Sequence, residues 1–121
     1  MDLRDATTTL VGIEGLLTRN LSLATDRDSE RVAGASVTPG LFRLLGMAPQ
    51  LGRDFRDDEG AEPGFESVAL ISHGIWQRLF AGAGDVVGRP LPVNGRSLTV
   101  VGVMPRGFAF PEQHEVWLPY R

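Results

Sequence analysis

The sequence contains no cysteine and no lysine, and each absence removes a class of chemistry. Without cysteine there is no disulfide framework, no thiolate metal ligand and no cysteine nucleophile. All 12 basic residues are arginines. The chain therefore cannot supply the lysine that a Walker A phosphate loop or a Schiff base requires.

Long apolar runs are also missing. No stretch approaches the roughly 18 apolar residues that a membrane span needs. The first residues, 1–5, lack the basic and then apolar pattern of a signal peptide. We therefore expect a soluble piece of chain that was taken from a longer protein.

The composition is that of one ordinary globular domain. Fifteen acidic and 12 basic residues give a formal charge of −3, so no positive field attracts a nucleic acid. Hydrophobic residues make up 42% of 121 positions, which is enough for a core. We expect a single domain over residues 1–121 with no nucleic-acid partner.

The strongest local prediction is a hairpin within residues 87–105, where two apolar strands flank Asn94 and Gly95. Both residues tolerate positive φ, as a type I′ turn requires, and the twist of that turn matches the strands it joins. We expect this hairpin to protrude and to stiffen the lobe that carries it.

Apolar periodicity and capping residues predict the other elements. Strands are expected in the second half of residues 11–25 and over residues 31–37, 67–72 and 115–120. A short helix is expected to open at Thr38 and Pro39 with its leucines on one face, and a second to run from the N-cap Ser72 to about residue 81. The fold class is therefore α+β, with a small, mainly antiparallel sheet, two short helices and the hairpin.

The segment over residues 56–66 is acidic and is interrupted by glycine and proline. This composition predicts a mobile loop, because it is too polar and too broken to pack. Its carboxylates lack the alternating spacing of a calcium-binding loop. A solvated loop is favoured over a calcium site.

Candidate catalytic residues are few. Ser72, His73 and Asp85 could be imagined as a hydrolase triad, but neighbouring side chains at a helix start diverge and no Gly-x-Ser-x-Gly elbow is present. Ser72 is already explained as an N-cap. His73 and His114 are too few and too far apart in sequence for a zinc site. We assign no catalytic residue, metal or cofactor.

The aromatic residues suggest one contact surface. Trp76 and Phe80 fit the core stripe of the second helix. Phe108 and Phe110 instead lie in a loop bounded by prolines, residues 105–111, where both rings could be exposed. These two phenylalanines are the candidate partner contact.

Three blocks together resemble the MacB-like periplasmic core domain of ABC transporter permeases of the macrolide-exporter and lipoprotein-release type. Residues 37–55 read VTPGLFRLLGMAPQLGRDF, which is similar to the family pattern V-S-x-x-Y/F-F-x-x-L-G-x-x-P-x-x-G-R-x-F. The second block is residues 68–80, VALISHGIWQRLF, and the third is the hairpin region, residues 87–105. The order and spacing of the blocks match the family over most of the chain.

The resemblance implies an extracytoplasmic domain between the first and second transmembrane helices of a permease. It also implies a separate ATPase subunit or domain in the cytoplasm, a coupling role that transmits motion across the membrane, an envelope partner protein, and a dimer in the full transporter. The family supplies no catalytic residue to carry over. The expected location is the periplasmic face of the cell membrane.

The chain stops at residues 117–121, where the family continues with a further strand and helix, so the resemblance implies only the outer part of the domain. A second reading from another class remains open: a stand-alone secreted or periplasmic domain that binds a ligand or peptide. Flanking transmembrane segments in the parent protein would favour the permease.

Overall fold

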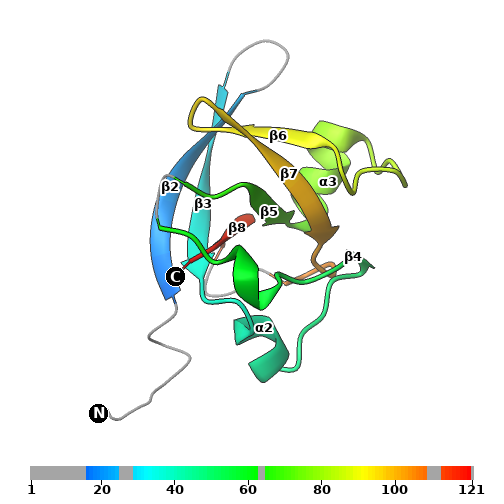
Figure 1. The fold of residues 1–121 in the computed structure, drawn as a ribbon. Helices are drawn as coiled ribbons and strands as arrows, with labels where there is room; N and C mark the ends of the chain where they lie inside the picture. Colours follow the sequence, from blue (N-terminus) through cyan, green and yellow to red (C-terminus); the bar gives the residue numbers. More distant parts are fainter. Residues whose placement is uncertain (1–15, 25–28, 63–64, 109–112, 121) are drawn as a thin grey trace.

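The strands of the domain form one sheet that closes on itself (Figure 1). The computed structural model describes residues 16–24, 29–62, 65–108 and 113–120. Its strands are β2 (Leu16–Ala24), β3 (Ser29–Val37), β4 (Leu51–Gly52), β5 (Val68–Ile71), β6 (Pro90–Val93), β7 (Arg96–Val103) and β8 (Val116–Pro119). Their order is β4-β7-β5-β8-β3-β2-β6, and an additional pairing of β6 with β7 closes a barrel-like ring.

The α+β class is confirmed. Most strand pairs are antiparallel, but the sheet is mixed and closed, which corrects the expectation of a small, mainly antiparallel sheet. Strand β3 pairs with β8 in parallel, and β5 pairs with β7 in parallel, so the sheet is mixed. Both parallel pairs join strands that are distant in sequence. Turn signals report only on consecutive strands, so the sequence reasoning had no access to these pairings or to the closure.

The hairpin at Asn94 and Gly95 is confirmed, with φ of 52° and 80° at the two turn residues. Its predicted protrusion is wrong. Asn94 donates its backbone N–H to the carbonyl oxygen of Ser22 in β2 at 2.9 Å, and its side-chain oxygen accepts the N–H of Ser22 at 2.9 Å. The turn is therefore part of the barrel wall and joins β6 to β2.

Two helices flank the barrel. Helix α3 (His73–Phe80) begins as predicted, because the Ser72 hydroxyl accepts the N–H of Ile75 at 3.0 Å. Helix α2 (Leu41–Leu44) is shorter than predicted, and its N-cap is Gly40 rather than Thr38. Its leucines do not share a buried face, since Leu44 is 66% exposed.

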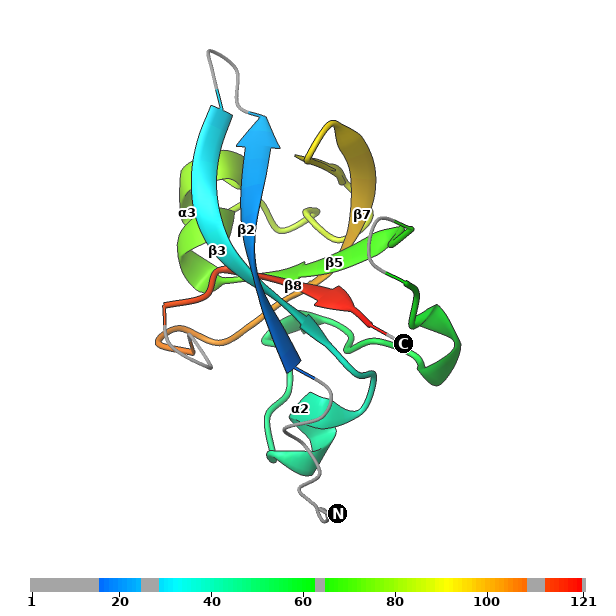
Figure 2. The ribbon, with the colours of Figure 1, turned by 90° about the vertical axis from the view of Figure 1, so that its left-hand side faces the viewer.

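The buried side chains form two clusters, and successive residues of β5 and β8 alternate between them, so the clusters lie on opposite faces of these strands. Figure 2 shows the two helices, α3 and α2, well apart around the sheet. The larger cluster includes Leu21, Leu23, Val32, Ala69, Ile71, Ile75, Val86, Leu91, Val93, Leu98, Val100, Val103, Val116 and Leu118. Trp76, Leu79 and Phe80 of α3 pack against this cluster and are only partly buried. The second cluster consists of Ala35, Val37, Leu41, Phe42, Phe55, Leu70, Val101, Met104 and Trp117, and α2 contributes to it.

The segment before the acidic residues is tied to the barrel. Phe55 is buried, and β4 pairs with β7. Gly52 has φ of 74°, and the Arg53 guanidinium donates to both carboxylate oxygens of Glu59 at 2.9 and 2.8 Å. These hydrogen bonds hold the pKa of Glu59 below its ordinary value.

The acidic segment also has structure of its own. Asp57–Glu59 form a 3-10 turn, η1. Glu66, at the far end of the segment, is 2% exposed, against the expectation that these residues are too polar to pack. Arginines explain its burial, because Arg19 lies 2.6 Å from its carboxylate. The mobility of residues 56–66 stays a prediction.

Candidate partner-contact groove

Three chain connections meet at one end of the barrel and form an open groove of about 590 Å³. They are the step from β5 into α3, the segment after β7, and the residues that lead into β8. The backbone N–H of Ser72 donates to the carbonyl of Glu115 at 2.8 Å, which joins two of them. The groove is lined by Ser72, His73, Gly74, Gly107, Phe108, Gln113, His114 and Glu115.

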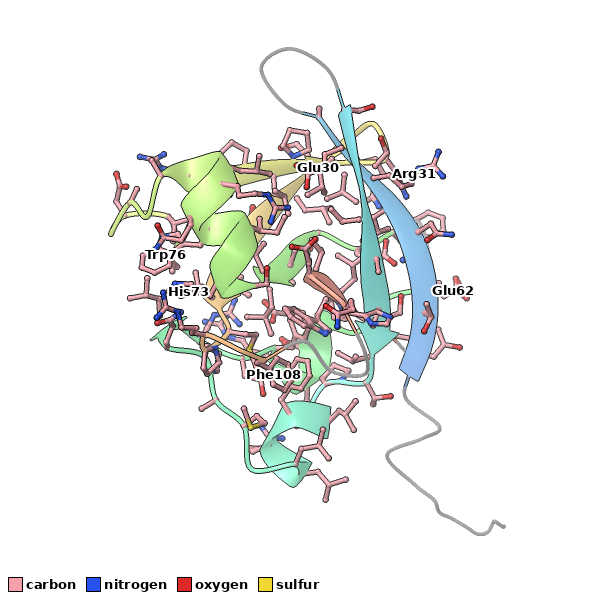
Figure 3. All side chains as sticks on the ribbon, turned by 180° about the vertical axis from the view of Figure 1, so that it is seen from behind. Glu30, Arg31, Glu62, His73, Trp76 and Phe108 are labelled. Carbon is pink, nitrogen blue, oxygen red and sulfur yellow. The ribbon has the colours of Figure 1, made fainter. Side chains whose placement is uncertain are left out.

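Phe108 enters this groove from the end of the segment after β7, and Figure 3 places it between α3 and α2. A turn at Gly107, with φ of 85°, brings the chain round to it. Its ring packs edge-on against Phe42 with centroids 5.3 Å apart and lies 5.4 Å from the ring of Trp117. Phe108 is therefore partly buried and braced by the second core cluster. Phe110 lies outside the described residues, and the contact role of both phenylalanines stays a prediction.

His73, the first residue of α3, is held by Gln50. The Gln50 amide nitrogen donates to the carbonyl of Met104 at 3.0 Å and lies 2.8 Å from His73 Nδ1. Since that nitrogen is a donor, Nδ1 accepts, and a neutral imidazole then carries its proton on Nε2. The ring also packs edge-on against Trp76, whose centroid lies 5.3 Å away (Figure 3).

The three residues of the imagined hydrolase triad are engaged in different interactions. The Ser72 hydroxyl caps α3, and His73 Nδ1 faces an amide rather than a carboxylate. Asp85 pairs with Arg89 at 2.8 Å. A nucleophile–histidine–carboxylate chain requires successive hydrogen bonds among its members, and these contacts do not form one.

His73 and His114 are far apart in sequence, but both line this groove. His114 is buried, and its Nε2 lies 3.3 Å from the Thr18 hydroxyl of β2. Within the described part of the chain, no group of three histidine, aspartate or glutamate side chains could hold a metal ion. The groove is thus a polar surface with one aromatic wall.

Beside the groove, Arg78 forms an ionic link that no pattern in the sequence predicts. Arg78 of α3 donates to Glu115 at 3.1 Å and also to Glu30 of β3. The hydrogen bond to Glu115 is the largest cause of the raised pKa of Arg78. Residues so far apart in sequence are brought together only by the fold, so no spacing pattern could have predicted this link.

Solved structures with the same fold include extracytoplasmic domains of ABC-type transporters. The extracellular domain of the noncanonic ABC-type transporter YknZ from Gram-positive bacteria matches with a TM-score of 0.67 and 16% identity, over 88% of this chain and 52% of that one. The periplasmic region of MacB from Actinobacillus actinomycetemcomitans matches with a TM-score of 0.67 and 18% identity, over 88% and 46%. A domain of a putative permease from Porphyromonas gingivalis matches with a TM-score of 0.53 and 19% identity, over 85% and 49%.

These likenesses establish the fold, which is that of the periplasmic or extracellular domain of ABC transporter permeases. The sequence profile of the MacB-like periplasmic core domain matches residues 2–121, and the chain belongs to this family. The resemblance found in the three sequence blocks is thereby confirmed. No curated protein is a significant match.

The chain spans about half the length of the solved structures it matches, between 46% and 52%. In the described residues, no helix combines the length and apolarity required to cross a membrane.

Proposed function

We propose that this domain is a non-enzymatic coupling element on the extracytoplasmic face of an ABC transporter permease. In this role it transmits motion driven by ATP hydrolysis in the cytoplasm to a substrate or partner protein outside the membrane. Membership of the MacB-like periplasmic core domain family over residues 2–121 is the observation that carries the proposal. The absence of lysine from the whole sequence agrees with ATP hydrolysis by another subunit or domain.

The architecture supports a mechanical role. A closed ring of paired strands is held more firmly than an open sheet, because no strand of the ring is left as an unpaired edge. Arg78 fastens α3 to β3 and to the start of β8 through two carboxylates. A displacement applied at the groove would therefore reach the barrel through fixed contacts. We further propose that Phe108 and Phe110 contact an envelope partner protein. We also propose that the full transporter is a dimer.

Location is tested with single cysteines, which the sequence lacks. Ser97→Cys places a thiol at an exposed position of β7, and Ser36→Cys places the same thiol at a position that is 0% exposed. In intact cells that express the full-length parent protein with every other cysteine replaced, a membrane-impermeant maleimide should label the first variant and spare the second. Labelling of Ser97→Cys only after the membrane is permeabilised would place the domain in the cytoplasm and contradict the proposal.

Coupling is tested in the purified transporter with spin labels on Ser97→Cys. Pulsed dipolar spectroscopy measures the distance between the labels of two copies, first without nucleotide and then with nucleotide trapped on the ATPase. We expect the distance distribution to shift on trapping. An unchanged distribution would contradict transmission, and the absence of any dipolar signal would contradict the dimer.

A further inference from the structure

One seam of the barrel is held differently from the others. Strand β2 pairs with β3 along its whole length, from Leu16–Val37 to Ala24–Ser29. On its other edge it pairs with β6 at one position, Leu23 opposite Val93. The reciprocal hydrogen bonds between Ser22 and Asn94 extend this contact by one residue, and both are 2.9 Å long.

Next to this short contact the wall is completed by side chains. Glu66, which is 2% exposed, lies 2.6 Å from the Arg19 guanidinium of β2 and 3.4 Å from that of Arg96 in β7. Arg96 also donates to the backbone carbonyl of Glu66, and Arg19 donates to the Ser36 hydroxyl at 3.2 Å. A small cavity of about 160 Å³ lies among these side chains.

We propose that the barrel opens and closes along this β2–β6 seam, and that the β2–β3 hairpin moves as one body away from the β6–β7 hairpin. The inference goes beyond the proposed function, because it concerns the domain itself whether or not transport uses the motion.

Two physical reasons single out this seam. Separating β2 from β6 breaks the two hydrogen bonds between Ser22 and Asn94 and one pair of the ladder. The β5–β8 ladder has two pairs and the β2–β3 ladder has nine. In addition, the groups freed beside the seam are a carboxylate and guanidinium groups. Water solvates such ions strongly, which offsets much of the cost of parting them. Opening also exposes the buried side chains of Leu23 and Val93, and this apolar cost limits how often the seam opens.

Amide hydrogen exchange on the full chain tests the proposal, because amides freed by a local opening exchange faster than those freed only by global unfolding. The N–H groups of Ser22 and Asn94 report on the seam. Those of Tyr120, bonded to Val37, and Met104, bonded to Ile71, report on other parts of the sheet. We expect the two seam amides to exchange at least about tenfold faster than the two reference amides.

Glu66→Gln should accelerate exchange of the seam amides by a further factor of about ten and leave the reference amides unchanged. The matched control is Glu115→Gln, which removes a carboxylate from the Arg78 link instead. If Glu66→Gln does not fold, Asn94→Gly serves. It keeps positive φ accessible and removes the side-chain acceptor, and the amide of residue 94 is then the readout. Equal protection of all four amides in the wild type, or equal acceleration of all four in the variant, would overturn the proposal.

Discussion

Alanine at Gly52 should destabilise the domain far more than alanine at Gly46, although both glycines have positive φ. The angles are 74° and 76°, so the backbone strain of a side chain is nearly the same at the two sites. The surroundings differ. A Cβ on Gly46 would meet nothing within 4 Å, whereas a Cβ on Gly52 would overlap the carbonyl oxygen of Val101 and lie 2.8 Å from the Cα of Gly102.

The expected magnitudes follow from these contacts. A left-handed conformation costs a residue with a Cβ roughly 1–2 kcal/mol. Alanine also has fewer conformations than glycine in the unfolded chain, which stabilises the folded state by about 0.4–1 kcal/mol. Gly46→Ala should therefore lower the free energy of unfolding by about 1 kcal/mol. At Gly52 the obstacle is backbone, so β4 must move away from β7. The hydrogen bonds from Gln50 to Val103 and from Arg53 to Val101 are then lost, at about 1 kcal/mol each, which gives a total of about 3 kcal/mol.

Urea unfolding measures both variants by tryptophan fluorescence, to which the partly buried Trp76 and the buried Trp117 both contribute. The midpoint should fall without a change in the denaturant dependence, because the surface exposed on unfolding is unchanged. A difference of less than about 0.5 kcal/mol between the two variants would refute the claim that close packing, rather than φ alone, requires glycine at position 52.

Two further predictions concern the groove and pH. Phe108→Ala should lower stability by about 2 kcal/mol, because a partly buried ring with two aromatic contacts is lost, and should reduce cross-linking of the full-length permease to an envelope partner. The same substitution at Phe65, which is 73% exposed, should change neither readout, and equal effects at both sites would contradict a specific contact. Glu59→Gln should cost about 0.5–1 kcal/mol at pH 7, allowing for solvent screening of Arg53. The folded pKa of Glu59 is lowered from 4.5, so this stabilisation is present above that pH and is lost as the pH falls through the lowered value. Unfolding curves that differ equally at pH 7 and pH 3 would contradict this account.

Local chemistry made several elements predictable from the sequence. The turn at Asn94 and Gly95 and the cap at Ser72 depend on residues within a few positions of one another, and both are present as predicted. Helix α2 shows the limit of such reasoning, because its apolar residues did not reveal that Leu44 would face solvent.

The groove was only partly accessible to sequence reasoning. Phe108 was singled out for its place in a loop between prolines, but its packing against Phe42 and Trp117 joins three distant segments. His73 and His114 were set aside because of their separation in sequence, and they line one groove. Spacing along a chain predicts proximity only within a helix, a strand or a turn.

The sequence alone was sufficient for the family, the α+β class and the hairpin. The order and spacing of three sequence blocks indicated the family, and turn chemistry and capping act over short distances along the chain. Only the tertiary structure could show that the hairpin is a wall of a closed, mixed barrel rather than a protrusion. Closure depends on the hydrogen bonds between Asn94 and Ser22 and on the ion pair between Glu66 and Arg19. Those residues are 72 and 47 positions apart, so their encounter is decided by the packing of the whole sheet.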